Sequence, residues 1–168
     1  HTPVGRRRIG RFTCRLPATY SPARTCRGTV MLTVDALDHL VLNVRDVEAS
    51  AAWYQRVLGM RRVDVEAADG NTRTSMMFGR NKINLRPIAT SQEVWFTGLE
   101  PCPGSDDLCF LTQLRPDDVA SHFRDCGVDI IVGPTTRSGA LGDICSVYVR
   151  DPDGNLIEVS SYSSEPSA

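Results

Sequence analysis

The chain has 168 residues, of which 41% are hydrophobic, and its formal net charge at pH 7 is −1. A chain of this length can bury roughly two-thirds of its unfolded surface in one domain, so neither a metal nor disulfides are needed merely for folding. No apolar run approaches the roughly 18 residues of a membrane span, and the chain from Asp35 onward is acidic, so we expect neither a membrane nor a nucleic-acid partner.

Residues 1–34 differ in composition from the rest of the chain. They contain seven arginines and no acidic residue, whereas the other 12 basic residues share the remainder with all 20 acidic ones. With three prolines in the first 22 residues and no helical period, this segment is predicted to be a disordered, Arg-rich leader. Two origins stay open: an organelle transit peptide, or an upstream region joined to a shorter protein that begins at Met31.

The six cysteines show no C-x-x-C pair and no spacing typical of a disulfide framework. This usage favours reduced thiols, because disulfides persist mainly in oxidising compartments. We therefore expect a cytoplasmic protein, with organelle import as the alternative if the leader is a genuine targeting segment.

The stretch ALDHLVLNV, residues 36–44, predicts a buried strand that contains a histidine. Because strand side chains alternate, Leu40, Leu42 and Val44 form an apolar face, and His39 lies on the opposite, mixed face. A histidine in this setting is either a hydrogen-bonded structural residue or a ligand. Both interpretations stay open at this point.

A helix and three strands are expected next. RDVEASAAWYQRVLGM has a candidate N-cap in Asp46, a helical stripe of apolar residues, and Gly59 at its C-terminus. Strand-like runs follow at about 60–67, 73–79 and 81–88. Residues 89–105 are rich in Gly and Pro and have no period, which predicts a linker.

The same order then restarts at Asp106. DDLCFLTQLRPDDVASHFRDCGVD predicts a strand and a helix that begins near Pro116. Three more strands are expected near 129–133, 143–150 and 155–161, with DPDGN as the turn between the last two. The chain is thus predicted to be an internal duplication of α+β class. Its single domain would span 35–162, with module 1 at about 35–88, module 2 at about 106–162, and a flexible tail at 163–168.

Superposing the two copies pairs four polar residues. His39 aligns with Asp107, and Asn84 aligns with Glu158. Alternation along the strands puts all four on corresponding faces, together with Ser160. We therefore expect polar groups from four separate strands to converge on one cavity.

Three stretches carry a resemblance to a known family: LDHLVLNVRDVEASAAWYQRVLGM, FGRNKINL and SVYVRDPDGNLIEVSSY. They resemble the vicinal oxygen chelate superfamily, which groups glyoxalases, bleomycin-resistance proteins and extradiol dioxygenases. Within it, the chain is most similar to the glyoxalase-domain-containing protein 5 type. The resemblance covers about 37–162 and implies two paired βαβββ modules that form a cupped mixed sheet with a divalent metal held inside it.

The resemblance places the metal ligands of the family on His39, Asp107 and Glu158. Asp107 stands where a histidine is commoner, and Asn84 stands where glyoxalase I has a glutamate, which argues against glyoxalase I activity. One imidazole and two carboxylates suit Mn, Fe, Ni, Co or Zn better than Mg. Glu158 is also a candidate catalytic base. The alternative is structural: Asp107 at a strand entrance, and Glu158 half exposed beside a turn.

Three further residues are candidates for substrate binding. Arg86 lies on the same strand face as Asn84, and it is predicted either to bind an anionic substrate at the rim of the metal site or to form a salt bridge. Arg137 begins the stretch RSGALGD, residues 137–143, which is predicted to be a loop that acts either as a mobile lid or as a simple connection.

These residues favour a metal-dependent lyase, isomerase or transferase on a small oxygen-rich substrate whose adjacent oxygens chelate the ion. The first alternative is a metal-free protein that binds a drug-like ligand between its modules, as the bleomycin-resistance branch does. The second is an extradiol dioxygenase, although iron sites of that kind usually use two histidines. A homodimer is an open alternative to a monomer.

A chain that begins at Met31 should fold as the full chain does. The leader has no apolar stripe with which to dock, so its removal should change the melting temperature by no more than a few degrees. Thermal unfolding followed by circular dichroism measures this directly. Loss of cooperative unfolding in the shortened chain would show that the leader packs on the body.

Overall fold

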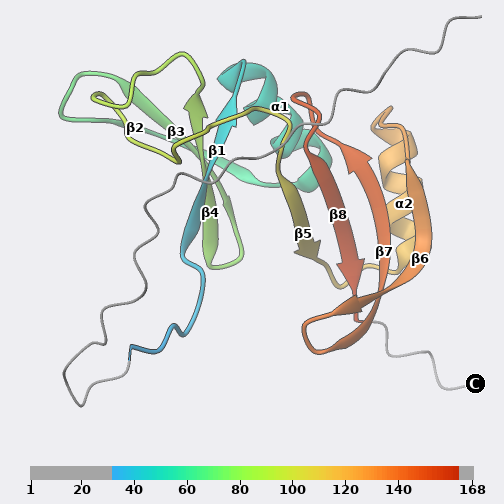
Figure 1. Cartoon of the computed structure of the whole chain (residues 1–168). Coiled ribbons are helices and arrows are strands. Elements are labelled where there is room, and N and C mark those ends of the chain that lie inside the picture. The colour runs from blue at the N-terminus through green and yellow to red at the C-terminus, as the bar shows by residue number, and fades with distance from the viewer. Residues whose placement is uncertain (1–31, 163–168) are drawn as a thin grey trace, which may run out of the picture. The chain divides into compact units, whose positions relative to one another are not determined.

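The computed structural model describes residues 32–162, so the tail at 163–168 and most of the predicted leader lie outside the described residues. Two modules of the order βαβββ follow one another, as predicted from the internal duplication, and the fold class is α+β. Figure 1 shows each module as a curved sheet with one helix on one of its faces. Module 1 contains β1 (His39–Val44), α1 (Val47–Leu58), β2 (Arg61–Glu66), β3 (Thr72–Phe78) and β4 (Asn81–Pro87). Module 2 contains β5 (Asp107–Leu111), α2 (Pro116–Asp125), β6 (Val132–Gly139), β7 (Gly142–Arg150) and β8 (Leu156–Ser161).

The two sheets have the same topology. Their strand orders are β1-β4-β3-β2 and β5-β8-β7-β6, and in each the first strand of the module pairs in parallel with the last. The registers also correspond. Val41 pairs with Asn84 in module 1, and Cys109 pairs with Glu158 at the equivalent position of module 2.

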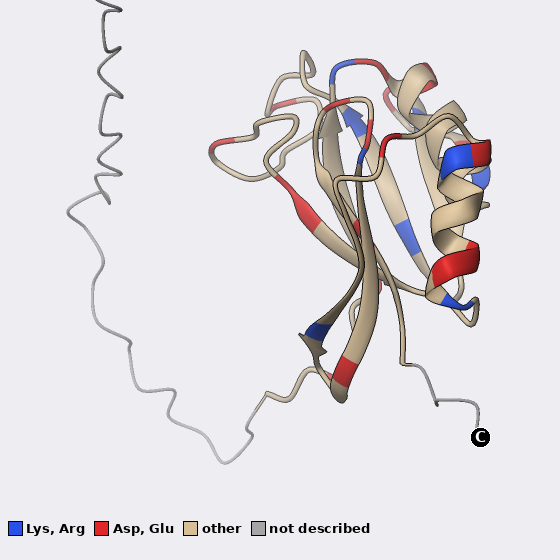
Figure 2. Cartoon of the chain, turned by 90° about the vertical axis from the view of Figure 1, so that its right-hand side faces the viewer, with Lys and Arg blue, Asp and Glu red and all other residues tan. Residues whose placement is uncertain are grey.

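The two helices begin and end where local sequence signals place them. The Asp46 carboxylate accepts a hydrogen bond from the Ala49 N–H at 3.0 Å, and Gly59 closes α1 in the left-handed conformation with a φ of 64°. Pro116 occupies the first turn of α2, where its missing N–H costs nothing. Figure 2 shows that α2 has acidic residues in its first turn and an arginine in its last, which complements the helix dipole.

One continuous core lies under both helices. It takes the apolar face of β1, including Leu42 and Val44, together with residues of α1, α2, β7 and β8 from both modules. Each helix covers one face of its own sheet, and the opposite face of each sheet has no helix on it. None of the helices within residues 32–162 is both long enough and apolar enough to cross a membrane.

The strand predicted near 129–133 is present but lies further along the chain, and the predicted loop at 137–143 is wrong. The strand β6 runs from Val132 to Gly139, and it forms a hairpin with β7 that turns at residues 140–141. Glycine and proline are uncommon inside strands, so the glycines and Pro134 hid the true bounds of β6 from the sequence pattern. The structure tolerates them because β6 is an edge strand and its register with β7 shifts between Val132 and Thr135. At this place Pro134 is not required to donate a hydrogen bond to the sheet.

The DPDGN turn, residues 151–155, joins the two modules. The Asp151 carboxylate is buried and accepts hydrogen bonds from the Tyr54 hydroxyl of α1 at 3.0 Å and from the Asn155 side chain at 2.8 Å. It also accepts from the backbone N–H groups of Asp153 and Asn155. Asp153 in turn accepts hydrogen bonds from the backbone and side chain of Arg45. Two buried carboxylates of module 2 thus bind module 1, one through Tyr54 in α1 and the other through Arg45, just before that helix.

The substitution Tyr54→Phe should lower the free energy of unfolding by about 1–3 kcal/mol, because it removes one donor from a buried carboxylate and replaces it with nothing. Tyr162→Phe is the matched control. The Tyr162 hydroxyl accepts only from the Leu141 N–H at an exposed position, so its loss should cost less than about 0.5 kcal/mol. Urea unfolding of both variants measures the difference. Equal stability of the two variants would show that the contact between Tyr54 and Asp151 contributes little.

Candidate metal-binding face

The predicted ligands lie on the sheet faces that the helices do not cover, which we call the open faces. On β4, the residues Ile83 and Leu85 are buried toward α1, so Asn84 and Arg86 belong to the open face of module 1 together with His39 on β1. On β8, the residues Ile157 and Val159 point toward the core, so Glu158 belongs to the open face of module 2.

Glu158 is half-buried within a group of hydroxyls. The Ser160 hydroxyl donates to Glu158 Oε1 at 3.1 Å, and Ser146 lies 2.8 Å from Ser160, oxygen to oxygen. Tyr148 on β7 is directly opposite Glu158 in the antiparallel register. Burial raises the pKa of Glu158, but hydrogen bonds from Ser146, Tyr148, Ser160 and Cys109 outweigh it, so the pKa lies below its usual range. Glu158 is therefore an ionised carboxylate at neutral pH.

Asp107 and Cys109 lie on β5, the strand next to Glu158. Cys109 is the register partner of Glu158, and Asp107 is two residues earlier on the same face, which places it one diagonal step from that glutamate. The Asp107 side chain is exposed and has no hydrogen-bond partner in residues 32–162. Burial raises the pKa of the Cys109 thiol. The open face of module 2 therefore carries two carboxylates and one thiol, and the thiol of Cys109 is next to Glu158.

His39 is not a core residue. Its side chain is 46% exposed, and its Nδ1 lies 2.6 Å from Oδ1 of Asp38. A neutral imidazole that donates Nδ1–H to this carboxylate presents the lone pair of Nε2 to a ligand, an arrangement common among metal-binding histidines.

Arg137 lies near Glu158, and Asn84 lies on the open face of module 1. The guanidinium of Arg137 is 5.5 Å from the ring centroid of Tyr148, and Tyr148 is the register partner of Glu158. The Asn84 side chain accepts a hydrogen bond from the Ser75 hydroxyl at 2.8 Å, so its NH₂ group is directed elsewhere.

The structure brings Asp107 and Glu158 onto neighbouring strands but leaves His39 on the other sheet. Among residues 32–162, no three His, Cys, Asp or Glu side chains are close enough together to hold one metal ion. The expected convergence of four strands on one cavity is therefore not seen within a single chain.

Comparisons with known proteins identify the family to which the chain belongs. Residues 36–95 match the model of the glyoxalase/bleomycin resistance protein/dioxygenase superfamily. The chain is 42% identical to virulence protein STM3117 of Salmonella typhimurium over 80% of this chain and 89% of that protein. It is 43% identical to the glyoxalase domain-containing protein RDO1 of Mycosarcoma maydis over 78% of this chain and 70% of that protein. The chain belongs to this superfamily.

A solved structure shows the same fold. The integron cassette protein VCH_CASS1 from V. cholerae is 44% identical, and the match covers 80% of this chain and 100% of that one with a TM-score of 0.73. The paired modules and their open faces are thus features of a glyoxalase-superfamily chain.

Among residues 32–162, Arg86 is the most deeply buried charged residue, with 1% of its surface exposed. Its Nε donates to the carbonyl of Trp95 at 2.8 Å, and its Nη2 donates to the carbonyls of Thr90 and Ser91. Its Nη1 donates to Asn43 Oδ1 at 3.1 Å and to the Pro87 carbonyl. None of these acceptors is a carboxylate, so the salt-bridge alternative is not seen in the described residues. Arg86 holds the linker against the open face, and a contact with substrate stays a prediction.

Sequence reasoning did not single out Tyr148 or Ser146. Both lie on β7, where alternation from the predicted strand 143–150 places them on one face. The missing information was the register between β7 and β8, which sets Tyr148 opposite Glu158 and Ser146 opposite Ser160.

The substitution Arg86→Met should lower the free energy of unfolding by about 2–4 kcal/mol, because several carbonyl groups lose a charged donor in a place that water does not reach. It should also speed hydrogen exchange in residues 90–97, which this side chain holds. Arg80→Met is the matched control, since Arg80 is exposed in the turn between β3 and β4 and should tolerate the change. Unchanged exchange in the linker of Arg86→Met would contradict the assigned role.

Proposed function

We propose that this protein is a divalent-metal-dependent enzyme that acts as a lyase, isomerase or transferase on a small oxygen-rich substrate. The observation that carries the proposal is Glu158, a half-buried carboxylate that accepts a hydrogen bond from Ser160 on an open sheet face, next to the strand that carries Asp107. Asp107 beside it and His39 at the equivalent position of module 1 complete the donor set. One nitrogen and two oxygen donors suit Mn, Fe, Ni, Co or Zn.

The donors fit a metal chemically, but one chain does not bring them together. The pair Asp107 and Glu158 lies on one sheet, and His39 lies on the other. We therefore propose that the site forms between two copies of the chain, with His39 from one and the carboxylate pair from the other. Neither open face carries a helix, and on the open face of module 1 the linker covers Arg86 but His39 stays 46% exposed, so a second copy can reach this histidine.

The residues around the carboxylates indicate what each would do. A bound metal would supply Lewis-acid chemistry to an adjacent pair of substrate oxygens. The Arg137 guanidinium next to Tyr148 would bind and orient an anionic group, and the Asn84 amide would donate a hydrogen bond to a substrate oxygen. Glu158 carries no proton at neutral pH, so it can only accept one. Its low pKa favours a role as ligand, and Asp107, which is exposed, is the second candidate base.

A metal-free protein that binds a small ligand is the second candidate. It is favoured by one observation, namely that no three His, Cys, Asp or Glu side chains in residues 32–162 lie close enough together to hold one metal ion. Metal analysis of purified protein separates the two functions. Stoichiometric divalent metal supports the enzyme, and ligand binding that is unchanged by a chelator supports the binding protein.

The substitutions His39→Ala and Glu158→Gln should each lower metal affinity by at least about tenfold, because each removes one donor atom. The stability of the metal-free protein should barely change, since both side chains contact solvent. His122→Ala is the control. It removes a hydrogen bond to the Val57 carbonyl at 2.8 Å, so it should cost stability and leave metal binding intact. Calorimetric metal titration and urea unfolding measure the two effects.

Mixing the two variants tests whether the site is shared between copies. If His39 and Glu158 come from different chains of a dimer, a random mixture of His39→Ala and Glu158→Gln should regain about a quarter of the metal sites, because half of the dimers then contain one intact site. A site within one chain would regain none.

Asp107→His should keep or tighten Ni or Zn binding if residue 107 is a ligand, whereas a loss of stability without a gain in affinity would show a structural role.

A further inference from the structure

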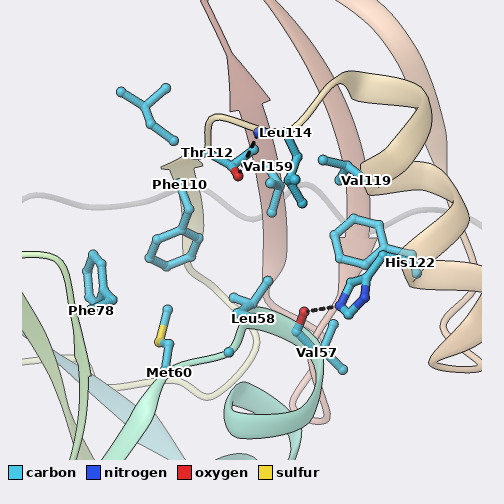
Figure 3. Close-up of a pocket in the computed structure, with 13 residues that line it drawn as sticks. Val57, Leu58, Met60, Phe78, Phe110, Thr112, Leu114, Val119, His122 and Val159 are labelled. Carbon is cyan, nitrogen blue, oxygen red and sulfur yellow. Dashed lines mark hydrogen bonds between the residues drawn. The ribbon is translucent and has the colours of Figure 1, made fainter.

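A cavity of about 300 Å³ lies at the seam between the two modules, on the side of the sheets that carries the helices (Figure 3). Both modules contribute to its wall. The end of α1 and the end of β3 provide one side, and β5, α2 and β8 provide the other. The lining residues that bear on its chemistry are Phe78, Phe110, Thr112, Leu114, His122 and Val159.

This seam cavity is separate from the candidate metal-binding face. Phe110 and Val159 line it, and they are sequence neighbours of Cys109 and Glu158 on the same two strands. Because strand side chains alternate, Phe110 and Val159 lie on the sheet face opposite Cys109 and Glu158, and only Leu111, at the end of β5, reaches the cavity from the other face. A molecule in the cavity would not touch Glu158 or Asp107.

The cavity opens to solvent beside Leu111 and Leu114, and most of its wall is apolar. An apolar molecule that enters it gains contacts with this wall and removes apolar surface from water. The volume of the cavity is at the lower end of the range for small-molecule sites. Phe78 and Phe110 meet edge to face at its wall, with ring centroids 5.3 Å apart, and offer a surface on which a flat ring can pack.

Two polar groups limit the chemistry of an occupant. Thr112 Oγ1 accepts a hydrogen bond from the Leu114 N–H at 3.2 Å, so its hydroxyl proton is available for donation. His122 Nε2 pairs with the Val57 carbonyl, so its Nδ1 is available as a second polar contact. No Lys, Arg, Asp or Glu lines the cavity, and a charged ligand would lose its hydration without gaining a partner.

We propose that the seam cavity is a second binding site, specific for a small neutral ring compound with one hydroxyl or carbonyl group. The ring packs against the touching pair of Phe78 and Phe110, and the oxygen accepts a hydrogen bond from the Thr112 hydroxyl. The site bridges both modules, so occupancy also stabilises their packing.

Titration of the full chain with 1-naphthol, a neutral ring compound with one hydroxyl, tests the proposal. Saturable binding with a Kd below about 1 mM is expected, together with a rise in melting temperature. Leu114→Trp should abolish this binding, because Leu114 is 53% exposed and lines the cavity mouth, where a larger ring blocks entry. Leu141→Trp is the matched control. Leu141 is 87% exposed in the hairpin turn of module 2, away from the cavity, so its replacement should leave binding unchanged.

The variant Thr112→Val should weaken 1-naphthol binding about fivefold by removing one hydrogen-bond donor. Three results would overturn the proposal: no saturable binding, equal binding by Leu114→Trp and the unchanged chain, or an altered oligomeric state of Leu114→Trp, which would show that a second copy covers the cavity. Metal content should be the same in all of these variants. A failure here therefore leaves the proposed metal site untouched, and loss of that site leaves 1-naphthol binding intact.

Discussion

The buried carboxylate of Asp151 is the contact on which the arrangement of the two modules depends. A carboxylate without partners in this position would be very costly, because burial removes its hydration. The DPDGN turn supplies three of its four donors from its own backbone and from Asn155, and only Tyr54 comes from module 1. Burial raises the pKa of the Tyr54 phenol, with the Asp151 charge acting in the same direction, so the hydroxyl keeps its proton and remains a donor. The turn is preorganised, and module 1 has only to offer one hydroxyl.

The two modules have diverged most on their open faces. Asn84 and Glu158 are equivalent by register, and two residues later Arg86 corresponds to Ser160. In module 2, the small Ser160 leaves space and donates to Glu158, which keeps that carboxylate ionised. In module 1, the large Arg86 fills the equivalent position and donates its hydrogen bonds to carbonyls of the linker. The duplication thus yields one face that can donate carboxylates and one that can donate only His39.

The sequence predicted the fold well because most of its signals are local. Alternation, the Asp46 cap, Gly59 and the DPDGN turn each act within a few residues, and each predicted the correct element. The strand β6, whose bounds were predicted wrongly, depends instead on its position at a sheet edge. Only pairing partners reveal that Pro134 is tolerated there.

The candidate site was only partly predictable for a related physical reason. The sequence identified which residues share a strand face, since that follows from alternation. It could not show that Arg86 is buried among carbonyl groups of its own linker, because this depends on the path of residues 89–105. Nor could it show that His39 and Glu158 lie on separate sheets of one chain. Ligand identity follows from chemistry, but convergence depends on how the modules, and the copies of the chain, are placed.

Two neighbouring strands of module 2 serve two surfaces at once. Along β5 and β8, residues that face outward include Cys109 and Glu158, and residues that face inward include Phe110 and Val159. Because strand side chains alternate, substitutions on the inner face and on the outer face change different contacts of the same two strands. The seam cavity and the carboxylate of Glu158 are therefore separate surfaces that share the backbone of β5 and β8, and Glu158 is not among the residues that line the cavity.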